Sequence, residues 1–268
     1  MATLNLKQGS AFLQTRSKSL DSFYLILVAA ISAQMLGEMA LGFEYGTPIR
    51  SMLFMEWGLS DLSATFIDRS LLSLSGLALC SLWPLPLSKN LRSWSALFIA
   101  FQQVMKALAI LATKPDGQFL LAPLAHGIRI LLPLAIASYQ ILSIKQIKKI
   151  LGVGVCLTFI GHGLEALAFR PSFIDFIIYF SPSFNFGIQW ESFAKSLLVL
   201  IGLIDIGVAG IFFANQSKKA LFYMGAWGLV TALIRIPYYG ELGIWEFLLR
   251  TSHWTIPFYL LYSQGSEQ

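Results

Sequence analysis

Apolar residues occur along this chain in blocks about as long as a membrane-crossing helix, separated by short polar segments. A transmembrane helix needs about 20 mostly apolar residues. Two longer connections, 43–65 and 170–193, are rich in aromatic and turn residues. Within the second, residues 173–180 (FIDFIIYF) predict an interfacial or re-entrant segment rather than a full span. The pattern predicts eight transmembrane helices, at 22–42, 66–87, 93–113, 119–142, 148–169, 194–215, 219–238 and 244–263.

The same pattern contains an internal repeat. Residues 69–77 (RSLLSLSGL) match 195–203 (KSLLVLIGL) at a separation of 126 residues. Weaker matches keep this order: LGE at 36–38 with GLE at 163–165, KAL at 106–108 with TAL at 231–233, and Pro133 with Pro257. An even number of helices in each half gives both halves one orientation, which makes the repeat parallel. Chance similarity between apolar helices is the alternative, but it does not easily give matches in four segments.

These patterns predict an all-α polytopic membrane bundle of about eight helices, arranged as two parallel four-helix repeats. We expect an N-terminal tail at 1–21, a first repeat at 22–143 and a second repeat at 144–264. Composition agrees: 56% of the 268 residues are hydrophobic, 12% are charged and the mean hydropathy is +0.67. Soluble domains are about 25% charged, so a soluble enzyme and a disordered regulator are excluded.

The sign and position of the charges predict an orientation. The N-terminal tail and the loops 88–92, 143–149 and 215–219 fall on one side of the membrane if there are eight spans. They hold Lys7, Arg16, Lys18, Lys89, Arg92, Lys145, Lys148, Lys149, Lys218 and Lys219. By the positive-inside rule, we expect both termini in the cytoplasm. The net charge of +5 forms no basic stripe, so the sequence does not favour a nucleic-acid partner.

A few ionisable residues fall inside the predicted spans, where charge is costly and usually marks function. Their depths follow from a rise of about 1.5 Å per residue. In the second half, His162, Asp205 and His253 fall in one layer, and Glu165, Arg235 and Arg250 fall in a second layer nearer the outer face. Glu241 and Glu246 are expected at the outer mouth. These eight residues form the candidate polar or ligand site.

The first half has an equivalent set with different chemistry. Glu38, Lys106 and His126 fall in its upper layer, and Gln34, Gln103 and Arg129 fall lower. Pairing Pro133 with Pro257 aligns His126 with Arg250 and Arg129 with His253. This suggests that one half holds the active site and that the other half is its structural descendant. A structural alternative is that buried pairs, such as Glu165 with Arg235 or Arg250, only fix helix register.

Cofactor motifs add little. Neither cysteine, Cys80 or Cys156, has a zinc-binding spacing, and no metal site is predicted. Two histidines at one depth would suit haem ligation, which we consider the less favoured alternative.

The second half resembles the DoxX-like family of bacterial membrane proteins. The residues that carry the resemblance are GHGLEAL at 161–167, GLID at 202–205, WGLVTALIR at 227–235, Gly240, Glu241, WEF at 245–247, Arg250 and Pro257. The first half looks like a diverged copy. The resemblance implies a four-helix membrane unit in a bacterial inner membrane. The family's best-understood members are subunits of thiosulfate:quinone oxidoreductase, so it also implies a quinone-linked role beside other membrane or periplasmic redox subunits.

Three functions are therefore open. In a quinone-linked redox subunit, His162, Asp205 and His253 would handle protons, while Arg235 and Arg250 would hold an anionic group facing the periplasm. A small-molecule transporter or ligand-binding membrane protein would use two parallel repeats for alternating access. The spans show no Gly/Pro breaks at mid-depth, which counts against transport. A non-catalytic scaffold would use the charges only for structure.

Overall fold

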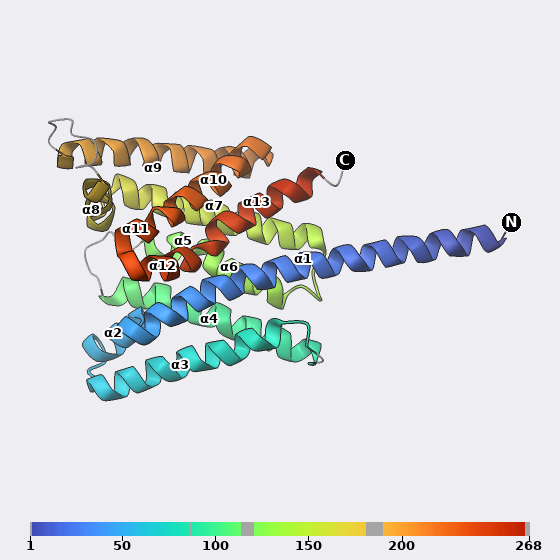
Figure 1. The fold of residues 1–268 in the computed structure, drawn as a ribbon, viewed down its shortest axis with the longest axis horizontal. Coiled ribbons are helices and arrows are strands. Elements are labelled where there is room, and N and C mark those ends of the chain that lie inside the picture. The colour runs from blue at the N-terminus through green and yellow to red at the C-terminus, as the bar shows by residue number, and fades with distance from the viewer. Residues whose placement is uncertain (1, 86, 114–120, 181–189, 266–268) are drawn as a thin grey trace.

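The computed structural model is built from helices (Figure 1). It describes residues 2–85, 87–113, 121–180 and 190–265, with the side chains of α1 described from Ser22 onward. No strand is present in these segments. Predictions that use Lys7, Arg16 and Lys18 concern side chains outside the described set.

Within the described residues, six helical segments are long and apolar enough to cross a membrane. They comprise α1 (Ala2–Tyr45) from Ser22 with α2 (Pro48–Met55), then α3 (Asp61–Leu82), α4 (Lys89–Thr113), α7 (Ile144–Leu167) and α9 (Trp190–Asn215). The sixth runs from α10 (Lys218–Leu233) through α11 (Arg235–Tyr239) and η3 (Gly240–Leu242) to α12 (Gly243–Leu249). The predicted tail at 2–21 is helical and continuous with the first span.

Three of the eight predicted spans are interrupted in the described part of the chain. The 219–238 span consists of α10 and α11, which meet at Ile234. The 119–142 span consists of α5 (Ala122–Ala125) and α6 (Gly127–Ala137), which meet at His126. The 244–263 span consists of α12 and α13 (Thr251–Gly265), which meet at Arg250. These breaks fall at residues that are neither glycine nor proline, so a search of the sequence for Gly/Pro breaks did not reveal them. Residues 173–180 belong to α8 (Pro171–Phe180), a ten-residue helix too short to cross a bilayer.

Side-chain caps fix where several helices begin. Ser143 caps α7 through a reciprocal capping box with Gln146, and Ser217 accepts from the backbone of Ala220 at the start of α10. Thr47 caps α2 and is itself hydrogen-bonded to the buried carboxylate of Asp68 on α3. These caps satisfy backbone donors that a helix start leaves free, so each short connection has a defined geometry.

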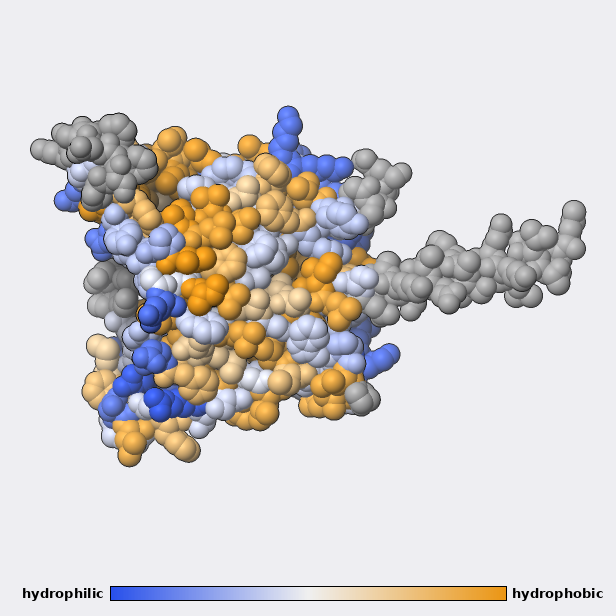
Figure 2. Space-filling view, in the orientation of Figure 1, coloured by the Kyte–Doolittle hydropathy of each residue, from blue (hydrophilic) through white to orange (hydrophobic). Residues whose placement is uncertain are grey.

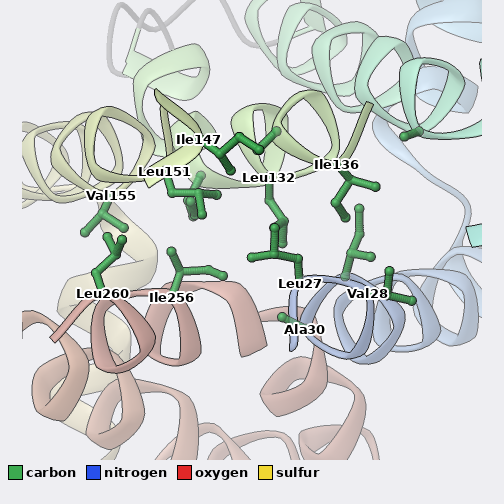
Figure 3. Packing of buried hydrophobic residues seen from close by; sticks show 14 of the residues in the cluster. Leu27, Val28, Ala30, Leu132, Ile136, Ile147, Leu151, Val155, Ile256 and Leu260 are labelled. Atoms are coloured by element: carbon green, nitrogen blue, oxygen red, sulfur yellow. The ribbon is translucent and has the colours of Figure 1, made fainter. Parts of the chain in front are cut away.

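The main hydrophobic core lies where α1, α6, α7 and α13 meet (Figure 3). Leu27 of α1, Leu132 of α6, Leu151 of α7 and Ile256 of α13 are fully buried there. Thus the first helix of each predicted half packs against the last helix of the other: α1 contacts α12 and α13, and α7 contacts α5 and α6. The two halves form one interlocked body.

On the face seen in Figure 2, apolar side chains alternate with weakly polar ones, and the most hydrophilic residues lie toward the ends of the bundle. Exposed large side chains include Leu62, Phe66, Trp94 and Phe213. The start of α1, the end of α13 and the connections α3–α4, α6–α7 and α9–α10 lie at one end of the bundle, whereas α2, α8, α11 and α12 lie at the other (Figure 1). An apolar wall between two such ends is typical of a membrane protein.

Candidate functional site

A cavity of about 980 Å³ lies in the part of the bundle farther from the start of α1. Its wall is formed by residues of both predicted halves, from α4 to α13. Aromatic and aliphatic side chains from α8 and α9, including Phe176, Phe193 and Leu197, make up one part. The titratable side chains of the wall include three histidines, four arginines and three carboxylates: His126, His162, His253, Arg129, Arg170, Arg235, Arg250, Glu165, Asp205 and Glu246.

Glu165 is the most enclosed of the three carboxylates, with 1% of its side chain exposed. It bonds His162 Nδ1 at 3.0 Å and accepts from Arg170 Nη1 at 2.6 Å. The expected partners Arg235 and Arg250 are not its partners, because the chain turns at the end of α7 and brings Arg170 back onto the carboxylate. With Nδ1 engaged by Glu165, His162 has a buried Nε2 that finds no hydrogen-bond partner among the described residues.

His253 connects the two halves. The Nε of Arg129, on α6, donates to His253 Nε2 at 3.4 Å, so Arg129 belongs to this cavity and not to a separate site in the first half. The rings of His162 and His253 lie 5.6 Å apart in tilted contact. Haem ligation would require the two rings to face each other across a porphyrin, and this direct contact leaves no room for one.

Asp205 lies deeper on α9 and is 4% exposed. Tyr223 of α10 donates its hydroxyl to Asp205 Oδ1 at 3.1 Å, and Trp227, one turn further along α10, lines the cavity. Neither Tyr223 nor Arg170 was among the residues predicted from the sequence. Arg170 could have been found in the sequence because it follows Glu165 by only five residues. Tyr223 could have been found because α10, on which it lies, directly follows the helix that carries Asp205.

The part of the cavity wall formed by α8, α11 and α12 holds two further arginines. Arg235 lies 3.9 Å from Glu246 and stacks over the ring of Phe176 at 5.5 Å. Arg250 ends α12 and lines the cavity at the helix break. The Nε atoms of Arg235 and Arg250 are buried without a hydrogen-bond partner among the described residues. Glu241 is exposed in η3 and is not part of the wall.

The remaining residues predicted in the first half form a different cluster. Lys106 Nζ pairs with Glu38 Oε1, and Gln103 donates to Glu38 Oε2 at 2.8 Å. Gln34 accepts from Ser252 at 2.5 Å. His126 bonds the carbonyl of Ala122 at 2.8 Å and faces the cavity instead. Among the described residues, no group of three His, Cys, Asp or Glu side chains could hold a metal ion.

Comparisons of the chain with family models, with curated proteins and with solved structures found no match. The functional argument therefore rests on the chemistry of this cavity.

Proposed function

We propose that this chain is a DoxX-like integral membrane protein whose cavity binds a quinone-type ligand as the membrane subunit of a redox complex. The observation that carries the proposal is the cavity itself. It joins an aromatic and aliphatic wall to a cluster in which two histidines are in contact. An apolar pocket with a few convergent polar groups is the usual form of a small-molecule site.

Two parallel repeats, with eight membrane segments in all, are the arrangement we infer. Equivalent contacts support it. A side chain at Gly161 would meet the backbone of Leu124 and Ala125, and one at Gly37 would meet Leu248 and Leu249. Each of these pairs of positions is 124 residues apart.

Two hydrogen bonds repeat in the same way. Thr158 accepts from Ile128, and Gln34 accepts from Ser252. A separation of 124 residues also makes the helix breaks at His126 and Arg250 equivalent. With this alignment, the position equivalent to Glu38 is His162 and not Glu165.

The orientation is also a proposal. Lys89, Arg92, Lys145, Lys148 and Lys218 lie near the connections at the same end as the start of α1. In a bacterial inner membrane, the positive-inside rule would make that end cytoplasmic and turn the mouth of the cavity toward the periplasm.

In this function, His162 and His253 would exchange protons with the ligand head. The unpaired Nε2 of His162 suits that role, since Nδ1 of the ring is bonded by Glu165, which Arg170 holds in place. Asp205 would serve as a deeper proton site, and the wall formed by α8 and α9 would receive the apolar part of the ligand.

The test is binding of decylubiquinone to the purified full chain, together with a lipid extract and an optical spectrum of that preparation. We expect co-purifying quinone, saturable binding, and a loss of affinity in His162→Ala of at least tenfold. Lys195→Ala alters an exposed ion pair with Glu191 outside the cavity and is the matched control. Equal quinone affinity in wild type and His162→Ala would remove the proposal.

A second function, transport of a small molecule, is favoured by the helix breaks. Discontinuous helices at equivalent places in two repeats mark the substrate site in several transporter folds. Here the breaks at His126 and Arg250 both face the cavity. Uptake into sealed vesicles separates the two functions, because a redox subunit moves no solute across the membrane.

A further inference from the structure

The wall of the cavity holds four arginines and three carboxylates, so its formal charge is positive by one when the histidines are neutral. Of its four arginines, Arg170 pairs with Glu165, and Arg235 lies within ion-pair distance of Glu246. No carboxylate among the described residues lies within 4.0 Å of Arg129 or Arg250. The contact recorded for Arg129 is the ring nitrogen of His253. Arg250 repels both Arg129 and Arg235, while Glu246 and Glu165 attract Arg129 and Arg250 from a greater distance than an ion pair.

Such an arrangement is costly in a membrane protein. A buried charge needs a partner of opposite sign and hydrogen bonds that satisfy its donors. The Nε donors of Arg235 and Arg250 are both buried and unsatisfied in the described part of the chain. An anion placed between these guanidinium groups would remove the repulsion and accept both hydrogen bonds.

We propose that the cavity binds an amphipathic anion, with a carboxylate or phosphate head seated on Arg250, Arg235 and Arg129 and an apolar body lying along α8 and α9. The body is assigned from the wall beside the arginines, where Phe176, Phe193, Leu197 and Ile201 all line the cavity. The head can come from a free fatty acid or from a phospholipid. This inference rests on the proposed function only in that both use the same cavity.

The test uses the full chain in phosphatidylcholine nanodiscs and compares laurate with dodecanol, which has the same tail without the charge. We expect laurate to bind saturably and at least tenfold more tightly than dodecanol. Arg250→Gln and Arg235→Gln should each weaken laurate binding at least tenfold. Arg250→Lys, which keeps the charge but loses the fork of donors, should give an intermediate loss. Lys195→Gln should bind as the wild type does.

Native mass spectrometry with added phosphatidylglycerol or phosphatidylcholine identifies the source of the head. Retention of phosphatidylglycerol that is lost in Arg250→Gln indicates a lipid, and retention of laurate alone indicates a free acid; either supports the proposal. Equal affinity for laurate and dodecanol, or wild-type laurate affinity in both arginine variants, would overturn it. Decylubiquinone binding is measured on the same samples to separate the anion proposal from the quinone proposal. If decylubiquinone binds but laurate is not preferred over dodecanol, the anion proposal is rejected and the quinone proposal stands.

Discussion

The two halves of the molecule each contain a buried polar cluster. In the first half, Glu38, Lys106 and Gln103 satisfy one another, although Nε2 of Gln34, one turn earlier on α1, is buried without a partner among the described residues. Glu38 is held by Lys106 and Gln103, and all three residues are at most 9% exposed. Around the cavity, by contrast, His162, Arg235 and Arg250 have buried nitrogen atoms without partners. The first cluster is a buried ion pair that stabilises the fold, which we call the structural lock. The second cluster has unsatisfied hydrogen-bonding groups that a ligand could satisfy.

The difference bears on the proposed repeat. In its 124-residue register, Glu38 would correspond to His162, which lines the cavity. The first half thus has a buried ion pair at a position where the proposed second repeat has a cavity histidine. Four predictions test this contrast, from the largest expected effect to the smallest.

Lys106→Met should destabilise the protein by about 3–5 kcal/mol, because it leaves the Glu38 carboxylate buried without its counter-charge. The free energy of unfolding in a sodium dodecyl sulfate titration measures this. The double variant Glu38→Gln/Lys106→Met should recover much of the loss, since it removes both charges together. Unchanged stability in the single variant would show that the first cluster is no lock.

Gly161→Ala and Gly37→Ala should each cost about 1–3 kcal/mol, because the added methyl group meets backbone atoms of the opposite half. Similar losses at the two positions are expected if the halves dock on each other by equivalent contacts. Gly207→Ala is the control, since nothing lies within 4 Å of its added carbon. A loss at only one of the two positions would argue against the symmetric docking.

The comparison also separates what sequence can and cannot predict. Apolar run length correctly located α1, α3, α4, α7 and α9, since each span depends on composition alone. The breaks at His126 and Arg250 were missed. In both cases the last turn before the break is packed against a glycine of another helix, Gly161 or Gly37, and that contact is tertiary.

The site was predicted in part for a related reason. Helical rise gives the depth of a side chain, so His162, Glu165, Arg235 and His253 could be grouped by layer. Depth does not give the direction in which a side chain points or which helices are neighbours. Consequently Arg129 was assigned to the wrong cluster, and the partners of Glu165 were misjudged.

Tyr223→Phe should cost about 1 kcal/mol, the usual value of one hydrogen bond, because Asp205 then loses the hydroxyl that donates to it. Tyr262→Phe, at an exposed position of α13, should be neutral. The same unfolding titration measures both. A loss well above 2 kcal/mol for Tyr223→Phe would mean that the Asp205 pair is a second structural lock rather than part of an open site.

Arg250→Gln should leave stability within about 1 kcal/mol of the wild type, or raise it, because it removes a buried charge that no carboxylate within 4.0 Å balances in the described part of the chain. Residues kept for binding commonly reduce stability in this way. The unfolding titration must be made on protein freed of bound lipid and fatty acid, since a bound anion would itself stabilise the wild type. Adding laurate should then raise the stability of the wild type and not that of Arg250→Gln. A loss of several kcal/mol in the ligand-free variant would place Arg250 with Lys106 as a structural residue, and the contrast between the two clusters would fail.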